Sequence, residues 1–227
     1  MAKKSIEGML AINGGRPVRS TLLPYGHQMI DDEDIAAVVQ VLKSDWITTG
    51  PKVAEFEGAF AALVGSKYAV SLSSGTAALH AAAYAAGLES GDEVITTPMT
   101  FCATANCALY RGATPVFADV SADTLNIDPN EIAARITNKT KAIIPVDFAG
   151  HPADLDPILE LAEEMSLIVI EDACHALGAE YKGQSVGSIC DMTVFSFHPV
   201  KHITTGEGGM VSTDDEEKAA RMRRFRN

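Results

Sequence analysis

The pattern of apolar and polar residues changes at about residue 31. The first 30 residues are rich in glycine and proline and have no regular period, which predicts an approach segment without a core of its own. From residue 31, Ile35, Val38 and Leu42 recur at helical spacing after an acidic start that is typical of a helix N-terminus. The sequence therefore predicts a helix over residues 31–42 and one large domain over residues 31–227.

Helical and strand-like segments then alternate regularly. The predicted strands cover residues 68–72, 93–97, 114–118, 141–146, 167–170, 192–197 and 209–212. The predicted helices cover residues 56–64, 76–86, 100–109, 131–136 and 154–165, and a last helix has an acidic start at residues 214–217. Because most of these strands are continuously apolar, they are expected to lie buried in a mostly parallel sheet of an α/β fold.

Composition narrows the class of protein. With 227 residues, 47% of them hydrophobic, the chain can bury a substantial core. Its net charge of −12 would repel nucleic acid and anionic membrane surfaces. Without an apolar run long enough to span a bilayer, and without a signal peptide, the chain is expected to be cytoplasmic. The four cysteines lack C-x-x-C spacing, so we expect buried free thiols and no metal site.

Residues 73–76, Ser-Ser-Gly-Thr, lie between a predicted strand and an alanine-rich predicted helix. Small residues at a helix N-terminus leave its backbone N–H groups open, and that end of the helix attracts phosphate. Serine and threonine are also ordinary helix N-caps. The segment is therefore either a phosphate site or a simple cap.

Two acidic residues, Glu171 and Asp172, follow the strand predicted over residues 167–170. A buried carboxylate must meet a cation or remain near water, since leaving it unpaired costs several kcal/mol. A pyridinium nitrogen would satisfy Asp172, and so would a role as a helix cap or in a salt bridge.

Lys201 lies in a polar loop between the strands predicted over residues 192–197 and 209–212. A lysine flanked by an apolar strand and glycines gives up its proton more readily than a solvated lysine does. Imine formation with an aldehyde requires such a neutral amine. Lys201 is therefore either the lysine of an aldehyde-binding site or a solvated loop cation.

In the order and separation of these three motifs, the sequence resembles those of the DegT/DnrJ/EryC1/StrS family of sugar aminotransferases. The likeness runs from about residue 12 to the last residue and includes Ser-Gly-Thr at 74–76, Thr-Phe at 100–101, Glu-Asp-Ala at 171–173 and Ser-x-x-x-x-Lys at 196–201. It implies the aspartate-aminotransferase type of fold, known as PLP fold type I, and pyridoxal 5'-phosphate as the cofactor.

The resemblance also implies roles for individual residues. Lys201 would hold the cofactor as a Schiff base and shuttle a proton during transfer. Asp172 would pair with the ring nitrogen and keep it protonated. Phe101 would stack on the ring, and His175 would lie beside the ring hydroxyl. The phosphate would be held by Gly75, Thr76 and Ser196.

Residues 44–51, 144–150 and 195–209 resemble the branch of the family that makes an amino sugar on the way to pseudaminic acid of bacterial surface glycans. This likeness implies that L-glutamate donates the amino group and leaves as 2-oxoglutarate. The acceptor would be the 4-keto group of a UDP-linked 4-keto-6-deoxy-HexNAc sugar. Because the family works as homodimers with sites at the interface, a homodimer is expected.

Members of the family are longer and finish with a smaller C-terminal domain that completes the sugar site. The sequence contains no match to that domain, so the chain is expected to hold the large domain alone and to have weak catalytic activity or none.

Four other interpretations stay open. A family member that acts on another nucleotide-linked keto sugar would keep the reaction and differ in its substrate. A sugar dehydratase of the same family has histidine in place of the Schiff-base lysine, and Lys201 argues against it. A non-catalytic dimerisation or sensory module would keep the fold and lose the chemistry. A Rossmann-type nucleotide binder is disfavoured because no Gly-x-Gly-x-x-Gly follows the first strand.

Overall fold

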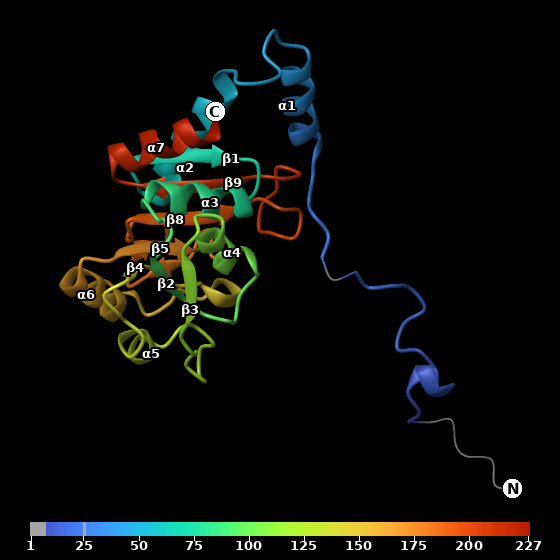
Figure 1. The fold of residues 1–227 in the computed structure, drawn as a ribbon. Helices are drawn as coiled ribbons and strands as arrows, with labels where there is room; N and C mark the ends of the chain where they lie inside the picture. The colour runs from blue at the N-terminus through green and yellow to red at the C-terminus, as the bar shows by residue number, and fades with distance from the viewer. Residues whose placement is uncertain (1–7, 25) are drawn as a thin grey trace, which may run out of the picture.

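A seven-stranded sheet forms the centre of the molecule, with the strand order β1-β9-β8-β5-β4-β2-β3 (Figure 1). The computed structural model describes residues 8–24 and 26–227, so the predictions for residues 1–7 and 25 lie outside the described part. The strands are β1 (Tyr68–Leu72), β2 (Glu93–Thr96), β3 (Thr114–Phe117), β4 (Thr140–Ile144), β5 (Ile168–Asp172), β8 (Met192–Ser196) and β9 (Gly209–Thr213). All of them run in one direction except β9, which is antiparallel to both of its neighbours. The predicted α/β fold with a mostly parallel sheet is confirmed.

Helices cover both faces of this sheet. They are α2 (Pro51–Val64), α3 (Gly75–Ala85), α4 (Ala103–Leu109), α5 (Pro129–Ala133), α6 (Leu155–Met165) and α7 (Glu216–Arg226), whereas α1 (Asp32–Leu42) lies away from the sheet and has no buried residue (Figure 1). On one face α3 lies against β8 and β9 and packs between α4 and α7, while α2 and α6 contact β1 and β5.

Successive residues of a strand pack into two apolar layers, one on each face of the sheet. Val194 of β8 packs with the alanines of α3 in one cluster, and its neighbour Phe195 packs with Phe60 of α2 in another. The rings of Phe60 and Phe195 meet edge to face, with 5.0 Å between their centroids. Because successive strand side chains point to opposite faces, a strand that is buried on both faces, such as β8, requires both layers.

Several predicted boundaries differ from the observed ones. Strand β5 continues through Glu171 and Asp172, which pair with Thr193 and Val194 of β8, so both acids belong to the strand and do not follow it. Helix α4 begins at Ala103, not at residue 100, and α2 begins at Pro51, five residues before the predicted start. Proline suits the first turn of a helix because the N–H that it lacks has no partner there.

Two short elements and one cysteine also depart from the predictions. Strands β6 (Glu180–Tyr181) and β7 (Gln184–Ser185) form a small antiparallel hairpin that has no counterpart among the predicted elements. All four cysteines are free thiols, but Cys102 is exposed at the start of α4. The prediction of buried thiols is therefore wrong for Cys102.

The N-terminal segment projects away from the body (Figure 1). Of the residues described between 8 and 30, none is buried, in agreement with the predicted lack of a core. Asp31 forms a capping box with Asp34 at the start of α1, yet Val38 and Leu42 on its apolar side are 61% and 66% exposed. Capping and charge at its first turn therefore define this helix more than burial does. Within the described part of the chain, every helix is too short or too polar to span a bilayer.

A buried ion pair ties the last helix to the sheet. Nη1 of Arg226 lies 2.5 Å from Oε1 of Glu57 in α2, and the same carboxylate oxygen accepts the N–H and hydroxyl of Ser71, each at 2.9 Å. We expect Glu57→Gln to lower the free energy of unfolding by about 1.5–3 kcal/mol, because it removes the charge from a set of charge-assisted hydrogen bonds. Urea titration measures the change. The matched control is Glu55→Gln, whose exposed pair with Lys52 is worth about 0.5 kcal/mol; equal effects of the two substitutions would contradict the role of Glu57.

Candidate active site

The carboxyl ends of the parallel strands meet the start of β9 at one edge of the sheet. Leu72 of β1 and Ser196 of β8 both pair with Gly209 of β9, so these three chain positions lie side by side. Every residue that the sequence predicts for the site lies at this edge or in a loop that leaves it: Gly75, Thr76, Phe101, Asp172, His175, Ser196 and Lys201. Such an edge is the usual place for ligands in open α/β sheets.

The N-terminus of α3 opens at this edge. Ser74 is the N-cap, and its hydroxyl accepts the N–H of Ala77 at 3.1 Å. The predicted capping is therefore confirmed, while the N–H groups of Gly75 and Thr76 belong to the first turn, where no intrahelical acceptor exists. A Cβ added to Gly75 would lie 2.9 Å from Cβ of Ser196, so the close approach of β8 requires glycine at this position.

Asp172 is a buried carboxylate at the end of β5, with 5% of its surface exposed. Its Oδ2 accepts the hydroxyl of Thr104 at 2.7 Å, and its Oδ1 accepts the N–H of Cys174 at 3.3 Å. No ion pair to Asp172 occurs among residues 8–24 and 26–227, so the salt bridge that the sequence left open as one alternative is not observed there. A partly compensated buried anion is suited to bind a cationic group of a ligand.

The sequence-based list of site residues omits Thr104. It lies in α4 and is fully buried beside Cys107 and Ala108. A hydroxyl on the buried side of a helix needs an acceptor, and here the acceptor is Asp172. The sequence contained one indication of this role, because Thr104 is a polar residue on the apolar face of a short helix.

Lys201 lies half-buried in the loop of residues 197–208, whose two ends are joined by the hydrogen bond from the N–H of Phe197 to the carbonyl of Gly208 at 2.9 Å. The carbonyl of Phe197 accepts both the hydroxyl of Thr204 and the N–H of Thr205. The N–H of Lys201 donates to the carbonyl of His198 at 2.8 Å. These bonds fix the path of the loop over the carboxyl edge of the sheet.

Electrostatics connect Lys201 with the residues that follow β5. Partial burial lowers the pKa of His175, and the positive charge of Lys201 lowers it further. The negative charge of Asp172 offsets part of this decrease. His175 is therefore neutral at neutral pH and lies within electrostatic reach of both residues. Phe101 stands before α4 with 71% of its surface exposed, so its ring is free to contact a ligand.

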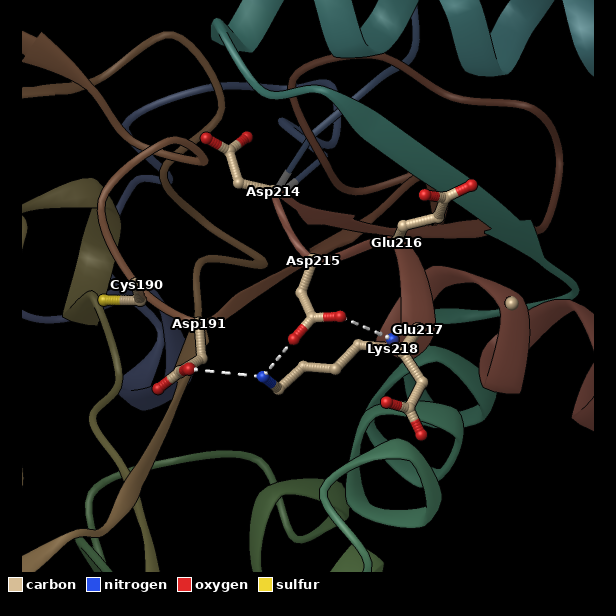
Figure 2. Close-up of a pocket in the computed structure, with 8 residues that line it drawn as sticks. Cys190, Asp191, Asp214, Asp215, Glu216, Glu217 and Lys218 are labelled. Carbon is tan, nitrogen blue, oxygen red and sulfur yellow. Dashed lines mark hydrogen bonds and ion pairs between the residues drawn. The ribbon is translucent and has the colours of Figure 1, made fainter.

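A hollow of about 760 Å³ lies at the opposite edge of the sheet, where β8 begins and β9 ends (Figure 2). Its lining is acidic, and Lys218 of α7 reaches across it to Asp191 at 3.5 Å and to Asp215 at 2.8 Å (Figure 2). Asp215 also caps α7 through the N–H of Lys218 at 3.0 Å. These contacts fix the first turn of α7 to the residue that precedes β8. In the described part of the chain, no group of histidine, cysteine and acidic side chains is arranged to hold a metal ion.

Solved structures of similar sequence share this fold. Helicobacter pylori PseC, an aminotransferase involved in the biosynthesis of pseudoaminic acid, is 40% identical and matches with a TM-score of 0.86 over 90% of this chain and 55% of its own. DesI, solved in the presence of its TDP-sugar product, is 41% identical with a TM-score of 0.89 over 94% and 55%. The PLP form of the putative sugar aminotransferase Spr1654 from Streptococcus pneumoniae is 38% identical with a TM-score of 0.85 over 88% and 57%.

The chain spans about half the length of the curated relatives that it matches, namely 54% and 53% of two proteins that are 52% and 51% identical to it. Residues 28–227 match the DegT/DnrJ/EryC1/StrS aminotransferase family, and this range contains every residue of the candidate site. The order of Gly75, Asp172 and Lys201 at the carboxyl edge of a mostly parallel sheet agrees with that match. The chain belongs to the DegT/DnrJ/EryC1/StrS aminotransferase family.

Proposed function

We propose that the protein is a pyridoxal-phosphate-dependent aminotransferase that acts on a nucleotide-linked keto sugar. The observation that carries this proposal is the buried Asp172, which has no ion-pair partner among the described residues and lies at the same edge as Lys201 and the open N-terminus of α3. A ligand with a cationic ring nitrogen, an aldehyde and a phosphate would suit these three features together.

The phosphate would lie at the N-terminus of α3. The open N–H groups of Gly75 and Thr76 are donors, and the hydroxyl of Ser196 at the end of β8 is close by, since a Cβ on Gly75 would approach its Oγ to 3.2 Å. The partial positive charge of the helix end favours the bound anion. An overall charge of −12 makes such local donors necessary.

The pyridine ring of the cofactor would lie between the buried Asp172 and the exposed Phe101. Asp172 would accept the N–H of the protonated ring nitrogen, while Thr104 and the N–H of Cys174 orient its two oxygens. Phe101 would stack on the ring, and the neutral His175 would lie beside the ring hydroxyl. When bound, the cofactor supplies an electron-accepting ring.

Lys201 would have two tasks. Its amine would hold the cofactor covalently at the aldehyde carbon in the resting protein. Once released, the same amine would move a proton between two carbon atoms of the reacting molecule, and the hydrogen-bonded loop that carries it would keep it within reach of both.

Glutamate is proposed as the amino donor, and the 4-keto group of a UDP-linked 4-keto-6-deoxy-HexNAc sugar as the acceptor. The likeness to PseC supports a sugar of this kind, and the TDP-sugar product seen with DesI supports a nucleotide-linked substrate more broadly. We further propose that the protein works as a homodimer in the cytoplasm and that residues 31–227 form its cofactor-binding large domain.

Because this chain spans about half the length of the curated relatives that it matches, the test follows the two halves of amino transfer separately in protein that extends over the relatives' full length. Glutamate alone should convert to 2-oxoglutarate in an amount equal to the bound cofactor, and a UDP-linked 4-keto sugar should then regenerate the starting absorbance spectrum. A spectrum that glutamate leaves unchanged would contradict the activity and favour a non-catalytic module. A preference for a TDP-linked sugar would keep the reaction and change the proposed substrate.

Gly75 offers a direct test of the phosphate site. We expect Gly75→Ala to lower the free energy of unfolding by about 1–3 kcal/mol, because the new Cβ would press on Ser196 and on Sγ of Cys174. It should also weaken binding of pyridoxal phosphate more than binding of pyridoxal. Gly58→Ala is the matched control, since Gly58 has open space around it in α2 and should gain about 0.5–1 kcal/mol. Equal loss of affinity for both ligands would contradict a phosphate at this helix end.

A further inference from the structure

Two buried carboxyl groups lie directly behind Asp172, and the proposed cofactor contacts use neither of them. Asp147 follows the end of β4, Glu171 precedes Asp172 in β5, and both side chains are fully buried. The N–H of Asp147 donates to the carbonyl of Asp172 at 3.1 Å, and the N–H of Asp172 donates to the carbonyl of Pro145 at 2.8 Å. The backbone therefore connects the position of Asp147 with that of Asp172.

Each of these carboxyl groups has one bonded oxygen and one unbonded oxygen. Oδ1 of Asp147 accepts the N–H of Ala153 at 3.0 Å, and Oε2 of Glu171 accepts the hydroxyl of Thr193 at 2.8 Å. Oδ2 of Asp147 and Oε1 of Glu171 are buried without a hydrogen-bond partner among the described residues. Two unpartnered carboxylate oxygens in one interior are strongly unfavourable, and one proton between them would give each a partner.

The charges around the two groups favour this proton. Burial, followed by the negative charge of Glu171, raises the pKa of Asp147 to about 9. Burial raises the pKa of Glu171 to about 7, while hydrogen bonds with Thr193 and Asp147 act in the opposite direction. The two carboxyl groups therefore titrate as a coupled pair, and burial favours the state in which the pair holds one proton.

The other titratable groups that face the pair are anionic or neutral. Asp172 lies beside it in β5. Burial, together with the charges of nearby carboxylates that include Asp147, raises the thiol pKa of both Cys174 and Cys190. Across the described ranges, no lysine, arginine or histidine contributes to the pKa of either carboxyl group. In these surroundings a proton reduces the repulsion between the two carboxylates.

We propose that Asp147 and Glu171 share one proton as a buried acid–carboxylate pair, and that this pair positions Asp172 for the ring nitrogen of the cofactor. Without the proton, three carboxylates would meet at the ends of β4 and β5, and their repulsion would displace the oxygens that face the ligand. The positioning role rests on the proposed function, whereas the shared proton does not.

Infrared spectra of the chain without cofactor test the pair directly. At about pH 8, between the two pKa values, the wild type should show the carbonyl stretch of a protonated carboxyl group, and this band should disappear as the pH rises through about 9. Asp147→Asn should lack the band, since its amide can still donate to Glu171 and preserve the packing. The matched control, Asp156→Asn at an exposed carboxylate, should keep it. Absence of a protonated carboxyl group in the wild type, or its persistence in Asp147→Asn, overturns the shared proton.

Cofactor titrations of the same proteins test the positioning role. In the wild type, the pair loses its proton above about pH 9, and this ionisation should weaken pyridoxal-phosphate binding. Asp147→Asn has no such proton to lose, so its affinity should fall by about tenfold less over the same pH range. Identical pH profiles for the two proteins overturn the role, even if the infrared band is present. Failure of every variant to bind the cofactor would refute the proposed function and the positioning role while leaving the infrared result for the pair intact.

Discussion

Replacing Lys201 with alanine should lower the rate at which glutamate is converted to 2-oxoglutarate by about 10²–10⁴-fold, the range expected when a positioned acid–base group is lost. Lys201 is the half-buried lysine of the loop between β8 and β9, where the hydrogen bonds of Phe197 and His198 hold the backbone. Removal of the side chain takes away both the amine that would hold the cofactor and the amine that would move the proton. Single-turnover kinetics with glutamate measure the effect.

Two matched variants separate the chemistry of Lys201 from its charge. Lys201→Arg keeps a positive charge but has no amine that can become neutral, so we expect it to be as inactive as the alanine variant. Lys139→Ala removes an exposed lysine ahead of β4, at the other edge of the sheet, and should leave the rate unchanged. Activity in Lys201→Arg close to that of the wild type would show that charge alone matters and would contradict the assigned role.

Replacing Asp172 with asparagine should lower the rate of amino transfer by about 10²–10³-fold, the effect of removing one preorganised electrostatic group from an active site. The substitution keeps the shape of the side chain, and the hydroxyl of Thr104 can still donate to the amide oxygen. What is lost is the negative charge that would keep the ring nitrogen protonated. Rates measured with saturating cofactor separate this effect from weaker binding.

Thr104→Val is the comparison for that experiment. It removes one hydrogen bond that orients Asp172 but leaves its charge in place, so the rate should fall by about tenfold. Thermal unfolding of both variants shows whether the buried surroundings have collapsed. An equally large loss in Thr104→Val and Asp172→Asn would indicate that orientation, and not charge, is what Asp172 contributes.

Much of the fold follows from local patterns in the sequence. Strand β1 has the predicted bounds of residues 68–72, because a short run rich in β-formers ends at small residues that cap a helix. The start of α2 was missed because Gly50 and Pro51 are typical of a turn, although proline is equally suited to the first turn of a helix. The hairpin of β6 and β7 has only two residues in each strand, too few to produce a periodic signal.

The site illustrates a different limit. The order of the motifs predicts that Gly75, Asp172 and Lys201 lie together, and the structure places Gly75 after β1, Lys201 after β8 and Asp172 at the end of β5, all at one edge of the sheet. The partner of Asp172 could not be found in the same way, because Thr104 is 68 residues away and has a local setting that resembles helix core. The pair of Asp147 and Glu171 is likewise formed by adjacent strands, and its unpartnered oxygens appear only in three dimensions.

Borohydride reduction of the chain with pyridoxal phosphate, followed by peptide mass spectrometry, tests the central claim most directly. Borohydride makes the bond between a lysine amine and the cofactor permanent, so the attached lysine can be identified. We predict a visible absorbance band and a single modified peptide that contains Lys201, both of which are missing in Lys201→Ala. Modification at another lysine, or an equal yield from Lys201→Ala, would contradict the assignment of Lys201 and with it the account of the site.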